Sequence, residues 1–309
     1  MEFKGADILS AKQFNRGDIE TVLKTAAKME PFASKKKWGD LLQGKLLASL
    51  FYEPSTRTRL SFETAMNRLG GRVVSSVGMQ FSSLTKGETL YDTGRIVENY
   101  GDVIVMRHPD NDSVEKLARG ANVPVINAGD GSNEHPTQSL LDLYTIQKEL
   151  GRLDGLTIAM VGDLKFGRTV HSLSHMLSHF GAELIFVSPP DLKMPEPICR
   201  FLKEKNIVYK ETADMGEAMK QANVLYMTRI QQERFEDMKE YEKHKGGYIL
   251  TRELVEEKNP KLVIMHPLPR IWEITADTDD VPGAAYFRQV ANGVAVRMAV
   301  LALVLGKTI

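Results

Sequence analysis

Short apolar runs rich in β-branched residues alternate with helical patterns from about residue 45 onward, and this alternation restricts the possible folds more than any other feature of the chain. The runs predicted to be strands are 46–52, 72–77, 102–107, 123–127, 156–161, 183–187, 224–227 and 262–265. The helical patterns between them include 62–69, 90–100, 137–150 and 169–180. Several runs are apolar throughout, as in strands that are covered on both faces. The repeated strand–helix–strand order therefore predicts an α/β fold of mostly parallel sheets flanked by helices.

The length of 309 residues favours two domains. A long helical pattern ends at Gly151, and a new strand–turn–helix unit begins at Leu156. We therefore predict one domain over 1–150 and a second over 151–291, each built on its own sheet. The last stretch, about 292–309, is very apolar, and we expect it to form a buried helix that packs back on the first domain.

The charge balance and the cysteine count disfavour several classes of protein. Lys plus Arg and Asp plus Glu each number 40, whereas proteins that bind nucleic acid or anionic membranes carry a basic excess. Cys199 is the single cysteine, so no intrachain disulfide and no cysteine-based metal site can form, and we expect a reducing, intracellular compartment. The start MEFKGADILS has no apolar stretch typical of a secretory signal, and no run approaches the ~18–20 apolar residues of a membrane span.

A cluster of hydrogen-bond donors follows the first predicted strand. The stretch Ser55–Thr58 is entirely polar, and Arg59 follows it directly. Ligands of parallel sheets bind at the carboxyl ends of the strands, and free helix N–H groups, hydroxyls and an arginine fork suit a phosphate. The simpler alternative is a helix N-cap by Ser55 beside two surface arginines. Because no Walker A motif is present, the donors favour a small phosphorylated metabolite over a nucleotide.

This stretch resembles the carbamoyl-phosphate signature of the aspartate and ornithine carbamoyltransferase family. The resemblance covers nearly the whole chain through motifs in one order: FYEPSTRTRLSFETA, SSLTKGET, VMRHP, INAGDGSNEHPTQSLLDL, MVGDLKFGRTVHSL, LYMTRIQQER and MHPLPR. It implies an enzyme that transfers the carbamoyl group of carbamoyl phosphate to the amino group of L-aspartate, with no cofactor and no metal. The products would be N-carbamoyl-L-aspartate and phosphate, in the committed step of pyrimidine (UMP) biosynthesis.

The resemblance also implies which residues bind carbamoyl phosphate. They are Ser55, Thr56, Arg57, Thr58, Ser83, Lys86, Arg107, His135, Gln138, Leu268 and Pro269. Those expected to act in catalysis are Arg57, Thr58, Lys86, Arg107 and His135. By the resemblance, Arg57 binds the phosphate together with the hydroxyl groups of Ser55, Thr56 and Thr58. Arg107 contacts both the phosphate and the carbonyl oxygen. His135 and Thr58 also donate to that oxygen, which makes an oxyanion-hole arrangement.

The carbamoyl NH₂ group is implied to contact Gln138 and the backbone of Leu268, beside Pro269. His135 and Gln138 are three residues apart at the start of a predicted helix, so both side chains can face one pocket. His135 by itself would more simply be a capping or core histidine. Its place in the EHPTQ motif, together with the other motifs, favours the substrate-binding interpretation.

The resemblance places the L-aspartate site on Lys86, Arg168, Arg229 and Gln231. Both arginines follow predicted strands of the second domain, at the sheet edge where ligands bind. The glycines of VGDLKFG do not form Gly-x-Gly-x-x-Gly, so a dinucleotide site is not indicated. The charged stretch 231–247 has the composition either of a mobile loop that closes over the site or of a plain exposed helix and turn.

The segment 80–88, which contains Ser83 and Lys86, has two interpretations. It is either an exposed loop with a solvated lysine or, by the resemblance, a mobile loop that enters the active site of a neighbouring subunit. The second interpretation requires a homotrimer with shared active sites. A separate zinc-containing regulatory chain also stays possible, as in parts of the family, and this chain has no zinc motif of its own.

The nearest alternative acceptor is ornithine, whose cationic side chain would meet Arg229 unfavourably. Ornithine-specific relatives use an HCLP segment, whereas this chain has His266-Pro267-Leu268-Pro269 without a cysteine. Charge therefore favours aspartate. A non-catalytic binding module is disfavoured because the matched positions all hold chemically competent residues, and a nucleic-acid binder is disfavoured by the zero net charge. No residue is an obvious general base, so we expect the departing phosphate to take the amine proton.

Overall fold

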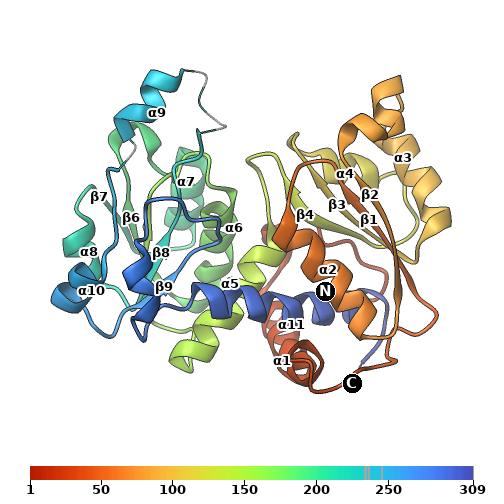
Figure 1. The fold of residues 1–309 in the computed structure, drawn as a ribbon, viewed down its shortest axis with the longest axis horizontal. Coiled ribbons are helices and arrows are strands. Elements are labelled where there is room, and N and C mark those ends of the chain that lie inside the picture. Colours follow the sequence, from red (N-terminus) through yellow and green to blue (C-terminus); the bar gives the residue numbers. More distant parts are fainter. Residues whose placement is uncertain (233–234, 236, 245, 309) are drawn as a thin grey trace. The chain divides into compact units, whose positions relative to one another are not determined.

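The computed structural model describes residues 1–232, 235, 237–244 and 246–308. The chain divides into two compact units (Figure 1). Unit 1 comprises Met1–Tyr144 and Val290–Ile309, and unit 2 comprises Thr145–Gln289. The divisions fall inside two helices, α5 (Pro136–Leu150) and α11 (Tyr286–Val304). The assignment of carbamoyl phosphate to the first predicted domain, 1–150, and of aspartate to the second, 151–291, stays a prediction.

Unit 1 contains a parallel sheet with the strand order β2-β1-β3-β4 (Figure 1). Its strands are β1 (Leu46–Phe51), β2 (Arg72–Val77), β3 (Val103–His108) and β4 (Val125–Asp130). Its helices, besides its parts of α5 and α11, are α1 (Arg16–Ala33), α2 (Thr56–Arg68), α3 (Leu90–Val97) and α4 (Ser113–Ala118). The connections leave β1 and β3 in opposite directions along the sheet. The carboxyl ends of these two strands are therefore a topological switch point, where parallel sheets bind ligands.

Unit 2 repeats this organisation with the strand order β7-β6-β5-β8-β9. Its strands are β5 (Thr157–Val161), β6 (Glu183–Val187), β7 (Tyr209–Thr212), β8 (Val224–Met227) and β9 (Val263–Met265). Its helices, besides its parts of α5 and α11, are α6 (Arg168–Leu177), α7 (Glu196–Glu204), α8 (Met215–Gln221), α9 (Met238–His244) and α10 (Arg252–Lys258). The chain runs from β5 toward β7 and then to β8 on the other side, so the switch point lies between β5 and β8.

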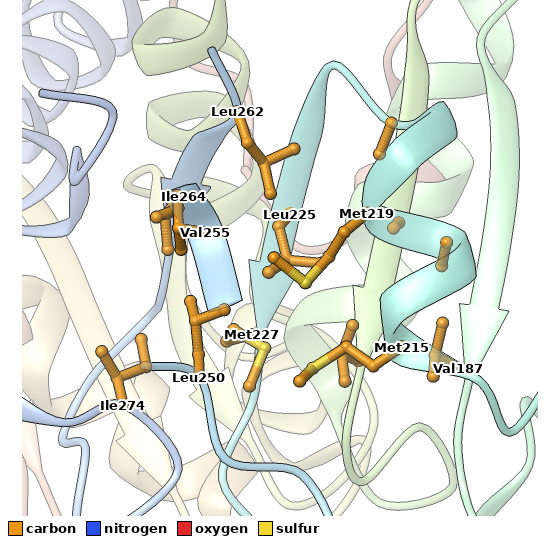
Figure 2. Packing of buried hydrophobic residues seen from close by; sticks show 14 of the residues in the cluster. Val187, Met215, Met219, Leu225, Met227, Leu250, Val255, Leu262, Ile264 and Ile274 are labelled. Carbon is orange, nitrogen blue, oxygen red and sulfur yellow. The ribbon is translucent and has the colours of Figure 1, made fainter. Parts of the chain in front are cut away.

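Each sheet is covered by apolar side chains of its helices. In unit 2, Leu225 and Met227 of β8 and Ile264 of β9 lie in one buried cluster with Met215 and Met219 of α8 (Figure 2). Each buried side chain of this kind contributes roughly 1.5–3 kcal/mol of transfer free energy. The packed sheets thus form rigid supports for the loops at their carboxyl edges.

The predicted α/β fold with parallel sheets is confirmed, with local differences. The edge strand β7 was not predicted, because its sequence Tyr-Lys-Glu-Thr has no apolar run and none of its residues is buried. The helix α2 begins at Thr56, ahead of its apolar pattern. The helix α11 begins at Tyr286 rather than near residue 292. The prediction started this helix too late because Arg288 and Gln289 interrupt the apolar pattern in its first turn.

Among the described residues, α11 is the one helix whose length and apolar composition would suit a membrane span, with a mean hydropathy of 1.3. We expected no stretch of that kind, and polar residues such as Arg297 do interrupt the run, but alanines and valines raise its mean. Within the protein 67% of the stretch is buried. A core helix satisfies the same test, so this property is weak support for a membrane location.

Candidate active site

The polar turn after β1 lies at the switch point of the unit 1 sheet, and α2 begins within it at Thr56. Ser55 occupies the N-cap position with an extended backbone (φ −160°, ψ 102°), but its side chain makes no capping hydrogen bond. Ser55 therefore does not cap the helix through its hydroxyl. Thr56 and Arg57 are exposed, whereas Thr58 is buried. The turn offers helix N–H groups, hydroxyls and a guanidinium, which are suitable ligands for an anion.

Arg107 lies near the carboxyl end of β3, opposite Phe51 at the end of β1. Its Nε is 3.0 Å from Oε2 of Glu53, and its Nη1 donates a hydrogen bond of 3.4 Å to the carbonyl oxygen of Ala128. The Arg107 and Glu53 side chains are 12% and 23% exposed. Glu53, which the sequence prediction did not include, therefore competes for Arg107 with any anion that binds at this edge.

Glu53→Gln is expected to tighten the binding of inorganic phosphate about 3- to 10-fold at low ionic strength, because Arg107 would lose a negatively charged neighbour. Calorimetric titration of phosphate measures this change. The matched control is Glu115→Gln, which removes an exposed carboxylate of α4 that pairs with Arg119. If phosphate bound to Glu53→Gln no more tightly than to the parent protein, Glu53 would not be a competitor for the anion.

The start of α5 positions His135 and Gln138. His135 is 4% exposed, and its carbonyl oxygen accepts a hydrogen bond of 3.0 Å from the N–H of Gln138. Gln138 is 8% exposed, and its Nε2 donates to Oδ1 of Asp142 at 2.9 Å. Because α5 follows β4, which neighbours β3, these residues begin at the same sheet edge as Arg107. Unit 1 thus places Arg107, His135, Gln138 and the polar turn at one edge of its sheet, whereas Leu268 and Pro269 belong to unit 2.

In unit 2 the predicted arginines follow the two strands at the switch point. Arg168 is the first residue of α6, after β5, and Arg229 follows β8. The buried carboxylate of Asp163 joins the two loops, because it accepts hydrogen bonds from the N–H groups of Phe166 at 2.9 Å and Gln231 at 3.4 Å. Burial raises the pKa of Asp163, while these N–H groups and the charge of Arg229 oppose the rise. Asp163 was not predicted, and it positions Gln231 relative to the Arg168 loop.

Gly162 allows these two loops to approach closely. Its φ is +117°, and a Cβ at this position would lie 2.3 Å from the carbonyl oxygen of Thr228. Thr228 in turn donates its N–H at 2.8 Å and its hydroxyl at 3.0 Å to the carbonyl oxygen of Val161. The first glycine of VGDLKFG therefore has a packing role at the switch point.

An apolar cluster supports the same loops. Its members are Leu192, Ile230 and Tyr241, with Phe166, Phe235 and Trp272 packed against them. Ile230 directly follows Arg229, and Phe166 lies two residues before Arg168, so the cluster fixes the backbone beside both arginines. Tyr241 belongs to α9, which is the helical part of the charged stretch 231–247. Residues 233–234, 236 and 245 of that stretch lie outside the described residues.

The segment after β9 holds Leu268 in an uncommon backbone conformation, with a φ of +58°, and the Leu268-Pro269 peptide bond is cis. The N–H of Leu268 donates to Nδ1 of His266 at 2.7 Å, and Nε2 of His266 is 2.8 Å from Oε1 of Glu273. Since Nδ1 accepts, Nε2 carries the proton toward the carboxylate. Burial alone would raise the pKa of Glu273, but the hydrogen bond from His266 holds it below its usual value. This buried pair fixes the backbone at Leu268.

Ser83 and Lys86 lie on a short 3-10 helix, Ser83–Lys86, between β2 and α3, and neither side chain is buried. This location is compatible with both interpretations of the segment. No cluster of three or more His, Cys, Asp or Glu residues that could hold a metal ion occurs in the part of the chain that the structure describes.

The residues that sequence reasoning missed are carboxylates within the motifs themselves. Glu53 stands in FYEPSTRTR, Asp142 in HPTQSLLDL and Asp163 in VGDLKFG. A carboxylate directly after a buried strand, or within an apolar helix pattern, requires a hydrogen-bond or charge partner. The positions of these carboxylates in the sequence therefore indicated that each has such a partner. The partner itself became visible only in the folded chain.

Two family models match the chain. They are "Aspartate/ornithine carbamoyltransferase, carbamoyl-P binding domain" over residues 6–148 and "Aspartate/ornithine carbamoyltransferase, Asp/Orn binding domain" over residues 154–304. The chain is also 52% identical over 306 residues to the aspartate carbamoyltransferase catalytic subunit of Methanosarcina barkeri, with 99% of both chains covered.

Solved structures give the same result. The catalytic subunit of aspartate transcarbamoylase from M. jannaschii is similar with a TM-score of 0.90 and 51% identity, over 99% of this chain and 98% of that chain. Aspartate transcarbamoylase from Trypanosoma cruzi in complex with carbamoyl phosphate and aspartate has a TM-score of 0.92 and 42% identity, over 98% of each chain. The same T. cruzi protein in complex with N-(phosphonacetyl)-L-aspartic acid has a TM-score of 0.91 and 42% identity, over 98% of this chain and 97% of that chain.

Proposed function

The chain belongs to the aspartate/ornithine carbamoyltransferase family, and we propose that it transfers the carbamoyl group of carbamoyl phosphate to the α-amino group of L-aspartate. The products are N-carbamoyl-L-aspartate and phosphate. The aspartate carbamoyltransferase catalytic subunit of Methanosarcina barkeri matches the chain over 99% of its length. The choice of aspartate as the acceptor depends on one observation, namely the charge of the side chains at the switch point of the unit 2 sheet.

That switch point presents arginines. Arg168 and Arg229 follow its two strands, and Gln231 lies beside them. Two guanidinium groups suit the two carboxylates of aspartate, because each planar fork can bind a carboxylate through two N–H groups. An ornithine ammonium group in the same place would be repelled by these two guanidinium groups. Aspartate therefore fits this edge.

The phosphate half of the reaction is assigned to the switch point of unit 1. Ser55, Thr56 and Arg57 bind the phosphate group through hydroxyls, helix N–H groups and the guanidinium. Thr58, Arg107 and His135 direct donors to the carbonyl oxygen of carbamoyl phosphate. Gln138 and the backbone of Leu268 contact the carbamoyl NH₂ group.

The chemical step consists of positioning and electrostatic stabilisation. The unprotonated amino group of aspartate attacks the carbonyl carbon, and negative charge develops on the carbonyl oxygen, where Thr58, Arg107 and His135 stabilise it. The bond between the carbonyl carbon and the phosphate oxygen then breaks. The departing phosphate accepts one proton from the nitrogen, so the chain supplies orientation rather than a general base.

N-(phosphonacetyl)-L-aspartic acid tests whether the two half-sites act as one, because it joins a phosphonate to an L-aspartate. We expect calorimetry to show one molecule bound per chain, at least about 100-fold more tightly than phosphonoacetate, which lacks the aspartate half. Equal affinity for the two compounds would contradict the proposal that the protein binds the aspartate group together with the phosphonate.

The accessible position of Ser83 and Lys86 supports a further part of the proposal, which is that Lys86 enters the active site of a neighbouring subunit in a homotrimer. Lys86 would then bind phosphate and aspartate in that site, and Ser83 would contact the phosphate. A monomer would lack one ligand in every active site. The cellular setting proposed is cytoplasmic pyrimidine biosynthesis.

Mixing two inactive variants tests the shared site. Arg57→Ala and Lys86→Ala chains, exchanged between trimers in equal amounts, are expected to form parent-like sites at about one quarter of the positions, where an intact Arg57 meets an intact Lys86. Activity should rise from nearly zero to a comparable fraction of the parent activity. Subunit exchange is verified with a mass-tagged chain. No recovered activity after verified exchange would contradict sharing of Lys86 between subunits.

A further inference from the structure

A buried hydrogen bond controls the orientation of the Gln138 carboxamide. Gln138 and Asp142 lie four residues apart on α5, and Nε2 of Gln138 donates to Oδ1 of Asp142 at 2.9 Å. Gln138 is 8% exposed and Asp142 is fully buried. An ionised carboxylate has only acceptor atoms, so it must face the NH₂ end of the carboxamide. This fixes Oε1 of Gln138 at the opposite end of the group.

A buried arginine supplies the balancing charge. Arg297 on α11 is 4% exposed, and its Cζ lies 5.1 Å from the centroid of the Phe62 ring on α2. Burial lowers the pKa of Arg297 to about 10, which leaves it cationic near neutral pH, and the negative charge of Asp142 opposes that decrease. Removal of Arg297 would leave the buried negative charge of Asp142 without this cation, and such a loss is strongly destabilising.

Gly293 provides the space for this arginine. It lies one helical turn before Arg297, and a Cβ at this position would be 2.8 Å from Nη1 of Arg297 and 3.1 Å from Cδ2 of Leu141. The close approach thus involves both α11 and α5. Arg297 therefore lies close to Leu141, the neighbour of Asp142 on α5, and to Phe62 of α2, all within unit 1.

We propose that Asp142 and Arg297 are positioning residues that select the carbamoyl group: Asp142 turns Oε1 of Gln138 toward the carbamoyl NH₂, and Arg297 balances the charge of Asp142. The inference rests on the proposed function. The NH₂ of carbamoyl phosphate is a hydrogen-bond donor, so it requires an acceptor. A reversed carboxamide would present its own NH₂ and would place donor against donor, at a cost comparable to that of a lost hydrogen bond.

Acetyl phosphate isolates this contact, because it has a methyl group in place of the NH₂ and is otherwise similar. The measured quantity is the discrimination ratio, defined as the dissociation constant of acetyl phosphate divided by that of carbamoyl phosphate, both obtained as competitive inhibition constants or KM values. Asp142→Asn can present either an acceptor or a donor to Gln138, so the carboxamide is no longer fixed. We expect the ratio to fall roughly 10- to 100-fold, with the affinity for inorganic phosphate unchanged.

A control separates this effect from general loss of charge on α5. Glu149→Gln removes a carboxylate of the same helix that pairs with Arg288 at 2.8 Å, remote in sequence from Gln138. Its discrimination ratio should equal that of the parent protein. An unchanged ratio in Asp142→Asn, with the parent protein active, would overturn the inference. A parent protein that forms no carbamoyl-aspartate would instead contradict the proposed function.

The double variant Asp142→Asn with Arg297→Met separates positioning from stability and is informative even if the single variant does not fold. Removing both buried charges should return the melting temperature toward that of the parent, since no cation is left unbalanced. The discrimination ratio should stay low, because the neutral amide that replaces the Asp142 carboxylate still cannot fix the carboxamide of Gln138. A ratio that recovered together with the melting temperature would show a purely structural role and would overturn the inference.

Discussion

Arg57→Ala is expected to lower kcat about 100- to 1,000-fold, because in the proposed reaction its guanidinium binds the phosphate, whose charge grows as the carbon–oxygen bond breaks. The side chain is exposed at the start of α2. Its removal should therefore change the free energy of unfolding by no more than about 0.5 kcal/mol. Initial rates of carbamoyl-aspartate formation and urea unfolding measure the two quantities.

The control for this prediction is Arg119→Ala, which removes another exposed arginine of unit 1, whose Nη2 lies 2.8 Å from Glu115. It should keep the parent kcat. A kcat of Arg57→Ala within threefold of the parent value would mean that the polar turn is not the phosphate site, since a typical oxyanion donor accounts for at least about 100-fold.

Arg229→Gln is expected to raise the KM for L-aspartate about 100- to 1,000-fold, because a neutral amide replaces the cation opposite a carboxylate. The inhibition constant of inorganic phosphate should stay unchanged, since the phosphate ligands of the proposal all belong to unit 1 and Arg229 belongs to unit 2. The control is Arg200→Gln, an exposed arginine of α7 in the same unit. An unchanged KM for aspartate in Arg229→Gln would contradict the placement of the acceptor at this edge.

The same variant carries a pH signature through Asp163. Burial already raises the pKa of Asp163, and the charge of Arg229 opposes the rise. Without Arg229 the pKa rises further, so the folded state holds a proton that the unfolded state releases near pH 4. Stability then falls as the pH increases from the unfolded pKa through the folded pKa. Arg229→Gln should therefore lose more stability relative to the parent at neutral pH than at pH 4, as urea unfolding at the two pH values measures.

Much of the fold could be predicted from local patterns. The strands β1, β3, β5 and β8 are covered on both faces, so their apolar runs are continuous and easily recognised. The strand β7 escaped prediction because an edge strand without buried residues has no such run. The start of α2 at Thr56 agrees with the helix start expected at the polar turn, although the apolar pattern of this helix begins only at Phe62.

The candidate site could be predicted less completely. Motifs predict which side chains bind a ligand, whereas the carboxylates that contact the predicted side chains or their loops depend on tertiary contacts. Glu53, which follows β1, pairs with Arg107 on the neighbouring strand β3. The N–H of Gln231 donates to Asp163, which lies 68 residues earlier in the sequence. Such pairs follow from strand order, and the sequence predicts parallel strands without predicting their order in the sheet.

Product formation from carbamoyl phosphate, with L-aspartate and L-ornithine supplied in parallel, tests the central claim most directly. The account predicts N-carbamoyl-L-aspartate and phosphate in equal amounts from the first mixture and no citrulline from the second. Citrulline without carbamoyl-aspartate would contradict the assignment of Arg168 and Arg229 to a dicarboxylate. Absence of both products from the purified protein would contradict the proposed reaction.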